Sequence, residues 1–401
     1  MQNTNSSDLR SFSFLTINQF FIQLAHSVFD ISLIWLILDL TGSNAATGLV
    51  MATAYLPFLL FSLPAGVFAD THSKALILKF TSFVRILIAA GIPLIAYTQD
   101  LNIFIIASVA FSLTLFSSFY IPARDALIPE YLKDSHLFKA NSAIQGSMQL
   151  AYILGPILAG FLIEVLGNIH IFFIASSLFF AATLFSLFLQ GHRNTINPDS
   201  QKMSLQDLKS IFSLMKKDQR LIWILVITMI DNLFIMGPAI VGIAIFVRTV
   251  LLGSASDYAL CESALAFGMV TGTLLLLRFG KNIPLGKMLI AGIFFDGLTY
   301  IPVYYLSSVK WLWITIFAHA LFIPMITVSR TTLIQKLVPP ALHGRIFSLV
   351  SISVIGFTAI SSAFTGLASE IVPIQSLFFI IGMGGAVTGI IAWFYKPLQQ
   401  L

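Results

Sequence analysis

The stretch GHRNTINPDSQKMSLQDLKSIFSLMKKDQR (residues 191–220) is the longest polar segment of the 401-residue chain and lies near its middle. The chain as a whole is 57% hydrophobic and only 10% charged, with a mean hydropathy of +0.92. A soluble protein carries about 25% charged residues, and the apolar runs here exceed the roughly 18 residues that mark a membrane-spanning helix. The sequence therefore predicts an all-α membrane protein that the polar segment divides into two halves.

Twelve apolar runs are long enough to cross a membrane, six on each side of the polar segment. They cover about 12–39, 47–69, 75–97, 101–121, 141–166, 169–190, 221–248, 256–279, 286–306, 311–336, 345–370 and 374–395. We expect an N-terminal half (1–190), a cytoplasmic linker (191–220) and a C-terminal half (221–401). Within the linker, Ser204 and Asp207 have the spacing of a helix-capping pair before an apolar face. This pattern fits a short amphipathic helix on the membrane surface or a solvated linker helix.

The basic residues predict the orientation of the chain in the membrane. The outer loops keep only Arg248 and Lys310, whereas most other lysines and arginines fall at the opposite ends of the spans. Because positive residues are retained in the cytoplasm, both termini are expected there, with the chain in the inner (cytoplasmic) membrane. This asymmetry also explains the net charge of +5 without a nucleic-acid partner.

The two halves resemble each other in sequence. An offset of 206 residues pairs Arg124 with Arg330, Lys139 with Arg345 and Gly160 with Gly366, without a gap. Each matching segment joins the fourth predicted span of its half to the fifth. A duplication of six helices in parallel orientation is typical of transporters that work by alternating access.

The first span carries a polar stripe in the stretch QFFIQLAHSVFD (19–30). Gln19, Gln23, His26 and Asp30 point in nearly the same direction at about 3.6 residues per turn. A charged carboxylate near the bilayer centre costs about 2.5–3.5 kcal/mol on insertion scales, so the stripe must face protein or water. Asp30 and His26 are titratable groups that could carry protons.

Three motifs resemble those of the Major Facilitator Superfamily. LPAGVFADTHSKALI (63–77) is similar to its loop signature G-x-x-x-D-R-x-G-R-R: Gly66 and Asp70 match, and Lys74 alone keeps a positive charge. SAIQGSMQLAYILGPILAGFL (142–162) is similar to its antiporter signature, with Gly155, Pro156 and Gly160 in place. YIPARDALIPEYLKDSHLFKAN (120–141), together with TLIQKLVPPALHGRIFS (332–348), resembles the drug:proton antiporter branch that includes macrolide efflux proteins and enterobactin exporters.

The resemblance implies two parallel six-helix repeats and roles for particular residues. It implies a central cavity lined mainly by the first, fourth, seventh and tenth spans, and a gate at the cytoplasmic ends. Candidates for proton coupling are Asp30, His26 and Asp231. Candidates for the substrate cavity are Gln19, Gln23, Asn232, Gln145, Gln149, Tyr152 and His319. Candidates for the cytoplasmic gate are Gly66, Asp70, Lys74, Arg124, Arg330 and Arg345. Arg85 and Asp296 fall on spans that are peripheral in this family, and we expect them to be structural partners of neighbouring helices.

The predicted function is secondary active export, by proton antiport, of an amphipathic small molecule such as a drug or a siderophore-like metabolite. Its expected partners are that substrate, protons and the lipid bilayer, and the chain is expected to be a monomer without a cofactor or a resident metal. The sequence contains neither G-x-x-x-x-G-K-[ST] nor H-E-x-x-H, and Cys261 is its one cysteine. Alternatives are a lysophospholipid flippase, a ferroportin-like metal exporter with Asp30, His26 and Asp231 as ligands, and an intramembrane enzyme or membrane scaffold.

Cysteine labelling tests the predicted orientation. After removal of Cys261, a single cysteine at Ser200 should react with a membrane-impermeant maleimide only from the cytoplasmic side. A cysteine at Ser43 should react only from the outside, because it follows the first span. Reaction of both cysteines from the opposite sides would contradict the orientation.

Overall fold

A computed structural model describes residues 6–98, 100–132, 134–191, 215–339 and 342–401. The regular structure in these residues is helical, and eleven of the helical segments are long and apolar enough to cross a membrane. The predicted span at 169–190 corresponds to α6 (Ile171–Leu187), which is apolar but has only 17 residues. Most of the predicted linker, residues 192–214, lies outside the described residues, and so does its predicted amphipathic helix.

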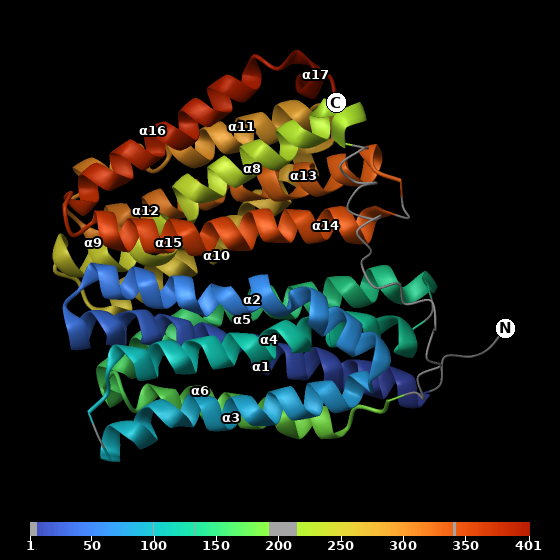
Figure 1. Ribbon diagram of the computed structural model, residues 1–401, viewed down its shortest axis with the longest axis vertical. Coiled ribbons are helices and arrows are strands. Elements are labelled where there is room, and N and C mark those ends of the chain that lie inside the picture. The colour runs from blue at the N-terminus through green and yellow to red at the C-terminus, as the bar shows by residue number, and fades with distance from the viewer. Residues whose placement is uncertain (1–5, 99, 133, 192–214, 340–341) are drawn as a thin grey trace. The chain divides into compact units, whose positions relative to one another are not determined.

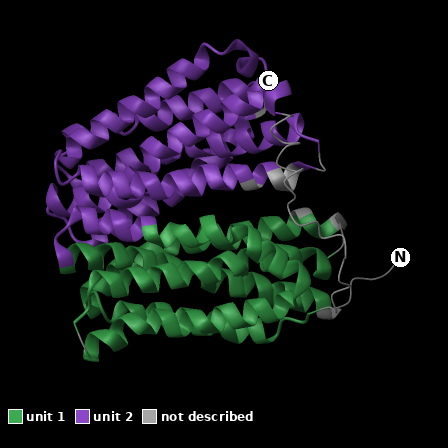
Figure 2. Ribbon diagram, in the orientation of Figure 1, with its two compact units in different colours: residues 1–40, 53–202 green, residues 41–52, 203–401 purple. Residues whose placement is uncertain are grey.

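The helices form two compact units (Figure 2). Unit 1 comprises residues 1–40 and 53–202, and unit 2 comprises residues 41–52 and 203–401. The helices of the first six spans are α1 (Ser6–Thr41), α2 (Asn44–Thr71), α3 (Lys74–Thr98), α4 (Ile103–Tyr131), α5 (Asp134–Leu166) and α6. Within unit 1, α3 packs along both α4 and α6 (Figure 1).

Unit 2 contains more breaks in its helices than unit 1. Its segments are α8 (Gln219–Gly237), η1 (Pro238–Gly242), α9 (Ile243–Thr249), α10 (Ala255–Phe279), η2 (Gly280–Asn282), α11 (Leu285–Leu298), η3 (Ile301–Tyr305), α12 (Val309–Ala320), α13 (Ile323–Leu337), α14 (His343–Ser351), η5 (Ile352–Gly356), α15 (Phe357–Ala368), α16 (Ile374–Trp393) and α17 (Lys396–Gln399). Helix α11 packs against α13 and α16, α10 packs against α12, and α8 packs against α15.

One pair of spans repeats the 206-residue offset found in the sequence. The span of α4, Ile103–Tyr131, and the span formed by α12 and α13, Val309–Leu337, each have 29 residues. Both of their ends differ by this offset. The likeness between the halves therefore extends from single residues to the bounds of this span, as expected for two parallel six-helix repeats.

Helix α4 is longer than the sequence pattern predicted. The predicted span ended near residue 121, because Arg124 and Asp125 interrupt the apolar run. The helix instead continues to Tyr131, with Leu127, Ile128 and Tyr131 buried. These apolar side chains pack on one side of the last turns, which extends the helix beyond its continuous apolar run.

A hydroxyl group bridges the break between α8 and the π-turn η1. Pro238 has no backbone N–H, and the Ser361 side chain of α15 lies beside this interruption. The Gly237 N–H donates to Ser361 Oγ at 2.7 Å, and Ser361 Oγ donates to the Leu233 carbonyl at 2.6 Å. The hydroxyl thus satisfies two backbone groups that no water could reach in the apolar core of a bilayer.

The first turns of α2 belong to unit 2. A Cβ atom at Gly48 would lie 2.8 Å from the Gly366 Cα, so the two backbones are in direct contact. Glu370 accepts hydrogen bonds from the Ala45 N–H and the Ser43 hydroxyl, both at 2.9 Å. These bonds hold the pKa of Glu370 below its usual range.

Helices α11 and α16 also touch through glycine. A Cβ at Gly385 would lie 2.9 Å from the Gly297 Cα, and one at Gly389 would lie 2.7 Å from the Phe294 Cα. Small residues four apart allow such close approach of two membrane helices. The Gly385–Gly389 pair is therefore a packing motif.

Substitution of Gly385 by alanine is expected to destabilise unit 2, because the new methyl group would press against backbone that cannot rotate away. Overpacking of this kind costs about 1–3 kcal/mol, which should appear as a lower apparent melting temperature in detergent. Gly146→Ala is the matched control, since its Cβ would meet nothing within 4 Å. Equal melting temperatures for the two variants would contradict close packing at Gly385.

Candidate functional site

The polar stripe of α1 is divided between the interior of unit 1 and a more open face. Gln19 is buried, Gln23 and His26 are half-buried, and Asp30 is exposed. The stripe therefore runs from a side chain enclosed by protein to a carboxyl group that is accessible. The contacts of each member show which helices it joins.

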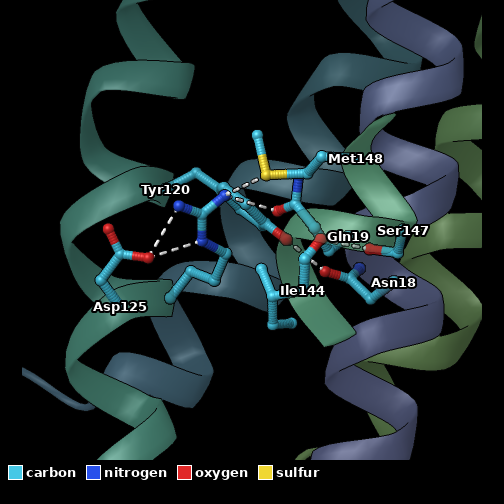
Figure 3. A network of polar contacts seen from close by, with 8 residues as sticks. Asn18, Gln19, Tyr120, Asp125, Ile144, Ser147 and Met148 are labelled. Atoms are coloured by element: carbon cyan, nitrogen blue, oxygen red, sulfur yellow. Dashed lines mark hydrogen bonds and ion pairs between the residues drawn. The ribbon is translucent and has the colours of Figure 1, made fainter. Parts of the chain in front are cut away.

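Gln19 belongs to a network that holds Arg124 (Figure 3). Arg124 Nη1 donates to Gln19 Oε1 at 2.9 Å and to the sulfur of Met148 on α5 at 3.6 Å. The same guanidinium contacts Asp125 through Nε at 2.8 Å and Nη2 at 2.7 Å. The buried Arg124 thus joins α1, α4 and α5 within unit 1. Its predicted role in a cytoplasmic gate stays a prediction.

Tyr120 and Asn18 connect the same region to α6. The Tyr120 hydroxyl donates to Asn18 Oδ1 at 2.6 Å, and Asn18 Nδ2 donates to the Ala182 carbonyl at 2.7 Å. Both side chains are almost completely buried. Sequence analysis did not single out Asn18 or Tyr120. In the structure, each side chain lies on the side of its helix that faces the other helix.

His26 contacts α4 and α6. Its Nε2 lies 3.1 Å from Ser117 Oγ, and its ring packs edge-on against Phe179. The Ser117 hydroxyl donates to the Leu113 carbonyl at 2.9 Å, so it accepts a hydrogen from His26 Nε2. In the described part of the chain, no hydrogen bond joins His26 to Asp30.

Asp30, Gln23 and Tyr152 share the open face of unit 1. Gln23 and Tyr152 share a hydrogen bond, and Asp30 lies close enough to Tyr152 to interact with it electrostatically. The Tyr152 side chain on α5 is 44% exposed. This group offers a carboxyl, an amide and a phenol on two neighbouring helices, which suits a polar contact to a bound molecule.

The other candidates on α5 lie along the same helix. Gln145 is exposed and Gln149 is half-buried. A Cβ at Gly155 would come within 2.6 Å of the Ser27 hydroxyl oxygen, so α5 passes close to α1 at this motif. Pro156 lies inside α5, and Gly160 is buried one turn further on.

Arg85 of α3 is fully buried beneath the stripe. Its guanidinium carbon lies 4.8 Å from the centre of the Tyr120 ring. Its three nitrogens have no hydrogen-bond partner among the described residues. The expected structural role in helix contacts fits this stacking, because a cation–π contact is worth about 2 kcal/mol or more when it is desolvated.

Unit 2 contains a second group of buried polar side chains. Asp231 and Asn232 are buried on α8, and Asn232 Nδ2 donates to the Thr228 carbonyl at 2.7 Å. His319 on α12 is 1% exposed, and its Nδ1 lies 3.5 Å from Asp296 Oδ1 on α11. The sequence placed His319 in the substrate cavity, whereas here its neighbour is a carboxyl group on a helix taken to be peripheral.

The remaining gate candidates are placed within their own units. Lys74 Nζ forms an ion pair with Glu130 Oε1 at 2.5 Å, joining α3 to the end of α4. Asp70 is exposed at the end of α2, and a Cβ at Gly66 would meet nothing within 4 Å. Arg330 lies on α13, close enough to Asp231 for an electrostatic interaction. Arg345 lies in α14.

A family model described as the Major Facilitator Superfamily matches residues 15–252, more than half of the chain. The chain belongs to this superfamily. It is therefore a multi-pass membrane transporter and not an enzyme, and the resemblance drawn from the loop and fifth-span motifs is confirmed.

Two relatives match most of this Major Facilitator Superfamily transporter. Macrolide efflux protein A of Streptococcus pyogenes is 21% identical over 341 residues, which is 81% of each chain. The staphyloferrin A transporter of Staphylococcus aureus is 21% identical over 389 residues, which is 96% of each chain. A bacterial homologue of the iron transporter ferroportin in an inward-facing state has the same fold, with a TM-score of 0.72 at 16% identity over 98% of this chain and 99% of that one.

The metal-exporter alternative requires side chains that together can bind a metal ion. Across them, no group of three or more His, Cys, Asp or Glu side chains is arranged to hold a metal ion. At 16% identity, the likeness to the ferroportin homologue concerns the fold alone.

The buried Tyr120–Asn18 bond can be tested by removing one hydroxyl. Tyr120→Phe keeps the ring over Arg85 but leaves Asn18 Oδ1 without its donor, and an unsatisfied buried group costs about 1–3 kcal/mol. The apparent melting temperature should fall. Tyr97→Phe is the control, because that hydroxyl bonds His170 at the exposed edge of unit 1. A Tyr120→Phe variant as stable as this control would rule out a stabilising role for the bond.

Proposed function

We propose that this transporter exports an amphipathic small molecule, such as a drug or a siderophore-like metabolite, in exchange for protons. Its relatives support export, since one is named a macrolide efflux protein and the other a staphyloferrin A transporter. The observation that carries the proposal is Asp30, an exposed carboxyl group on a membrane-spanning helix.

Asp30 has the chemistry that proton exchange requires. A carboxylate inside a membrane protein is costly unless it is paired, solvated or protonated. No ion pair to Asp30 occurs among the described side chains. Its neighbour Tyr152 carries an uncharged phenol and supplies no positive charge. The group can therefore lower its free energy by taking up a proton or by contacting a polar or cationic part of a substrate. Competition between these two ligands is the basis of antiport.

The proposed cycle assigns separate steps to proton and cargo. Asp30 gives up its proton toward the cytoplasm and receives cargo there, and a proton from outside then displaces the cargo. Alternating access exposes the group to each side in turn. Gln23 and Tyr152 would hold the polar part of the cargo, with Gln145 and Gln149 further along α5. His26 would help to position α1 beside α4, because its ring nitrogen hydrogen-bonds the Ser117 hydroxyl.

The proposal includes the orientation and the gate predicted from the sequence. Both termini would lie in the cytoplasm, with the transporter acting as a monomer in the inner membrane. Asp70 and the arginines at positions 124, 330 and 345 would then lie at the cytoplasmic ends of their helices. There they could restrain the gate between transport steps.

Flux measurements with Asp30→Asn test the proposal. In proteoliposomes with an imposed pH gradient, the wild-type protein should drive efflux of at least one member of a panel containing a macrolide, a lipophilic cation and a ferric siderophore. Asp30→Asn should reduce this flux to the level seen without a pH gradient, because an amide cannot release a proton. Passive exchange of labelled cargo should remain, since the amide keeps the shape of the site.

Glu164→Gln is the matched control, because Glu164 is an exposed carboxyl group at the end of α5. It should transport like the wild type. Wild-type rates in Asp30→Asn across a range of pH would show that the stripe on α1 is structural. Transfer of a fluorescent lysophospholipid without dependence on the gradient would favour the lipid-flipping alternative.

A further inference from the structure

Four helices of unit 2 bring titratable side chains together away from the stripe on α1. Asp231 comes from α8, Asp296 from α11, His319 from α12 and Arg330 from α13. The two carboxyl groups lie close enough to interact electrostatically, and so do Asp231 and Arg330. Asp231, Asp296 and His319 are at most 5% exposed. These three side chains are therefore shielded from bulk solvent.

The hydrogen bonds of Thr299 determine which nitrogen of His319 carries a proton. The Thr299 hydroxyl donates its one hydrogen to the carbonyl of Phe295 at 2.8 Å or of Asp296 at 3.0 Å. It lies 2.9 Å from His319 Nδ1 and must accept a hydrogen from it. The Nδ1–H group consequently points toward α11, where Asp296 Oδ1 lies at 3.5 Å.

The distance between His319 and Asp296 suits an ion pair better than a strong hydrogen bond, which is usually no longer than about 3.2 Å. Asp296 Oδ1 and Asp231 Oδ1 are both buried without a hydrogen-bond partner among the described residues. An ionised carboxylate in such a place would lack the donors that normally stabilise it. Asp296 is thus either protonated or paired with a positively charged His319.

The charges of these side chains also indicate that the cluster holds one additional proton. Arg330 can neutralise one carboxylate and lies near Asp231. Tyr300, which stacks on His319 with ring centres 4.3 Å apart, and Glu262 on α10 are the other titratable groups facing this region, and neither brings a positive charge. Two ionised carboxylates with one guanidinium would leave a net negative charge in the protein interior, which is strongly unfavourable. One additional proton on Asp296 or His319 removes it.

We infer that Asp296 and His319 together hold one exchangeable proton in the interior of unit 2. When the site releases this proton, the O–H bond of Asp296 breaks and leaves its electron pair on that oxygen, while the proton passes to a water molecule. No oxidation or reduction takes place. This inference rests on the proposed exchange of protons for cargo, and it adds a second protonation site in unit 2 to the one proposed at Asp30.

The role proposed for the Asp296–His319 pair differs from the structural role that the sequence suggested for Asp296. A purely structural bond would be equally well served by asparagine, which fits the same space and can accept the Nδ1–H hydrogen. A proton site requires a group that titrates. The two roles therefore differ in spectroscopy and in pH dependence more than in stability.

Infrared difference spectroscopy of the purified full-length protein tests the site directly. The wild-type protein should show a carbonyl band of a protonated carboxyl group that disappears as the pH is raised. Asp296→Asn should remove one such band, and Asp296→Glu should restore it at a shifted frequency. His319→Gln should change the pH at which the band titrates. Glu164→Gln should leave the band unchanged, and size-exclusion profiles establish that each variant is folded.

Flux measurements in the same proteoliposome assay separate this inference from the proposed function. Loss of gradient dependence in Asp296→Asn, together with loss of the band, supports the site. An unchanged band and an unchanged pH profile of flux in Asp296→Asn overturn it, even where Asp30→Asn abolishes transport. If wild-type flux ignores the pH gradient but the band titrates and depends on Asp296, the proposed proton exchange fails while the protonation site stands.

Discussion

The interior of a membrane offers no water to hydrogen-bonding groups, and the arrangement within each unit follows from this constraint. Backbone groups that a helix leaves unpaired must find partners inside the protein. The Ser361 hydroxyl meets this requirement by bridging Gly237 and Leu233 across the start of a π-turn. Asn18 meets the same requirement for its own buried side chain by donating to the Ala182 carbonyl of α6. Each such bond also fixes which helices are neighbours.

Close packing and polar bonding support one another in unit 2. The glycine contacts between α11 and α16 bring these helices together, and α11 carries Asp296 on another face. Ser361 joins α15 to α8 a short distance after Asp231. The carboxyl groups are thereby held on helices whose positions are fixed by small side chains and single hydroxyls.

The sequence predicted features that depend on one helix at a time. One such feature is the polar stripe from Gln19 to Asp30, which lies along α1. Another is the duplication at an offset of 206 residues, which recurs in the bounds of one pair of spans. It could not predict which helix each polar group would contact. Ser117 and Tyr120 are ordinary members of an apolar helix until α1 is packed beside them. The Asp296–His319 pair was missed for the same reason, since it joins two spans and Asp296 was assigned by the usual place of its helix in the family. The length of α4 was underestimated because Arg124 and Asp125 resemble a loop until the buried partners of Arg124 are seen.

Two histidines, the half-buried His26 and the buried His319, show how similar local bonding can support different chemistry. His26 and His319 each donate a ring hydrogen to a hydroxyl, Ser117 or Thr299, whose own hydrogen bonds a carbonyl one turn earlier. Their second neighbours differ in charge: Arg85 lies near His26, whereas Asp296 lies near His319. A histidine beside a guanidinium has no group to which it can hand a proton, but a histidine beside a carboxyl does. Under the proposed exchange, Asp30 would carry the proton in unit 1, whereas Asp296 and His319 would hold it in unit 2, so the two units would take part by different means.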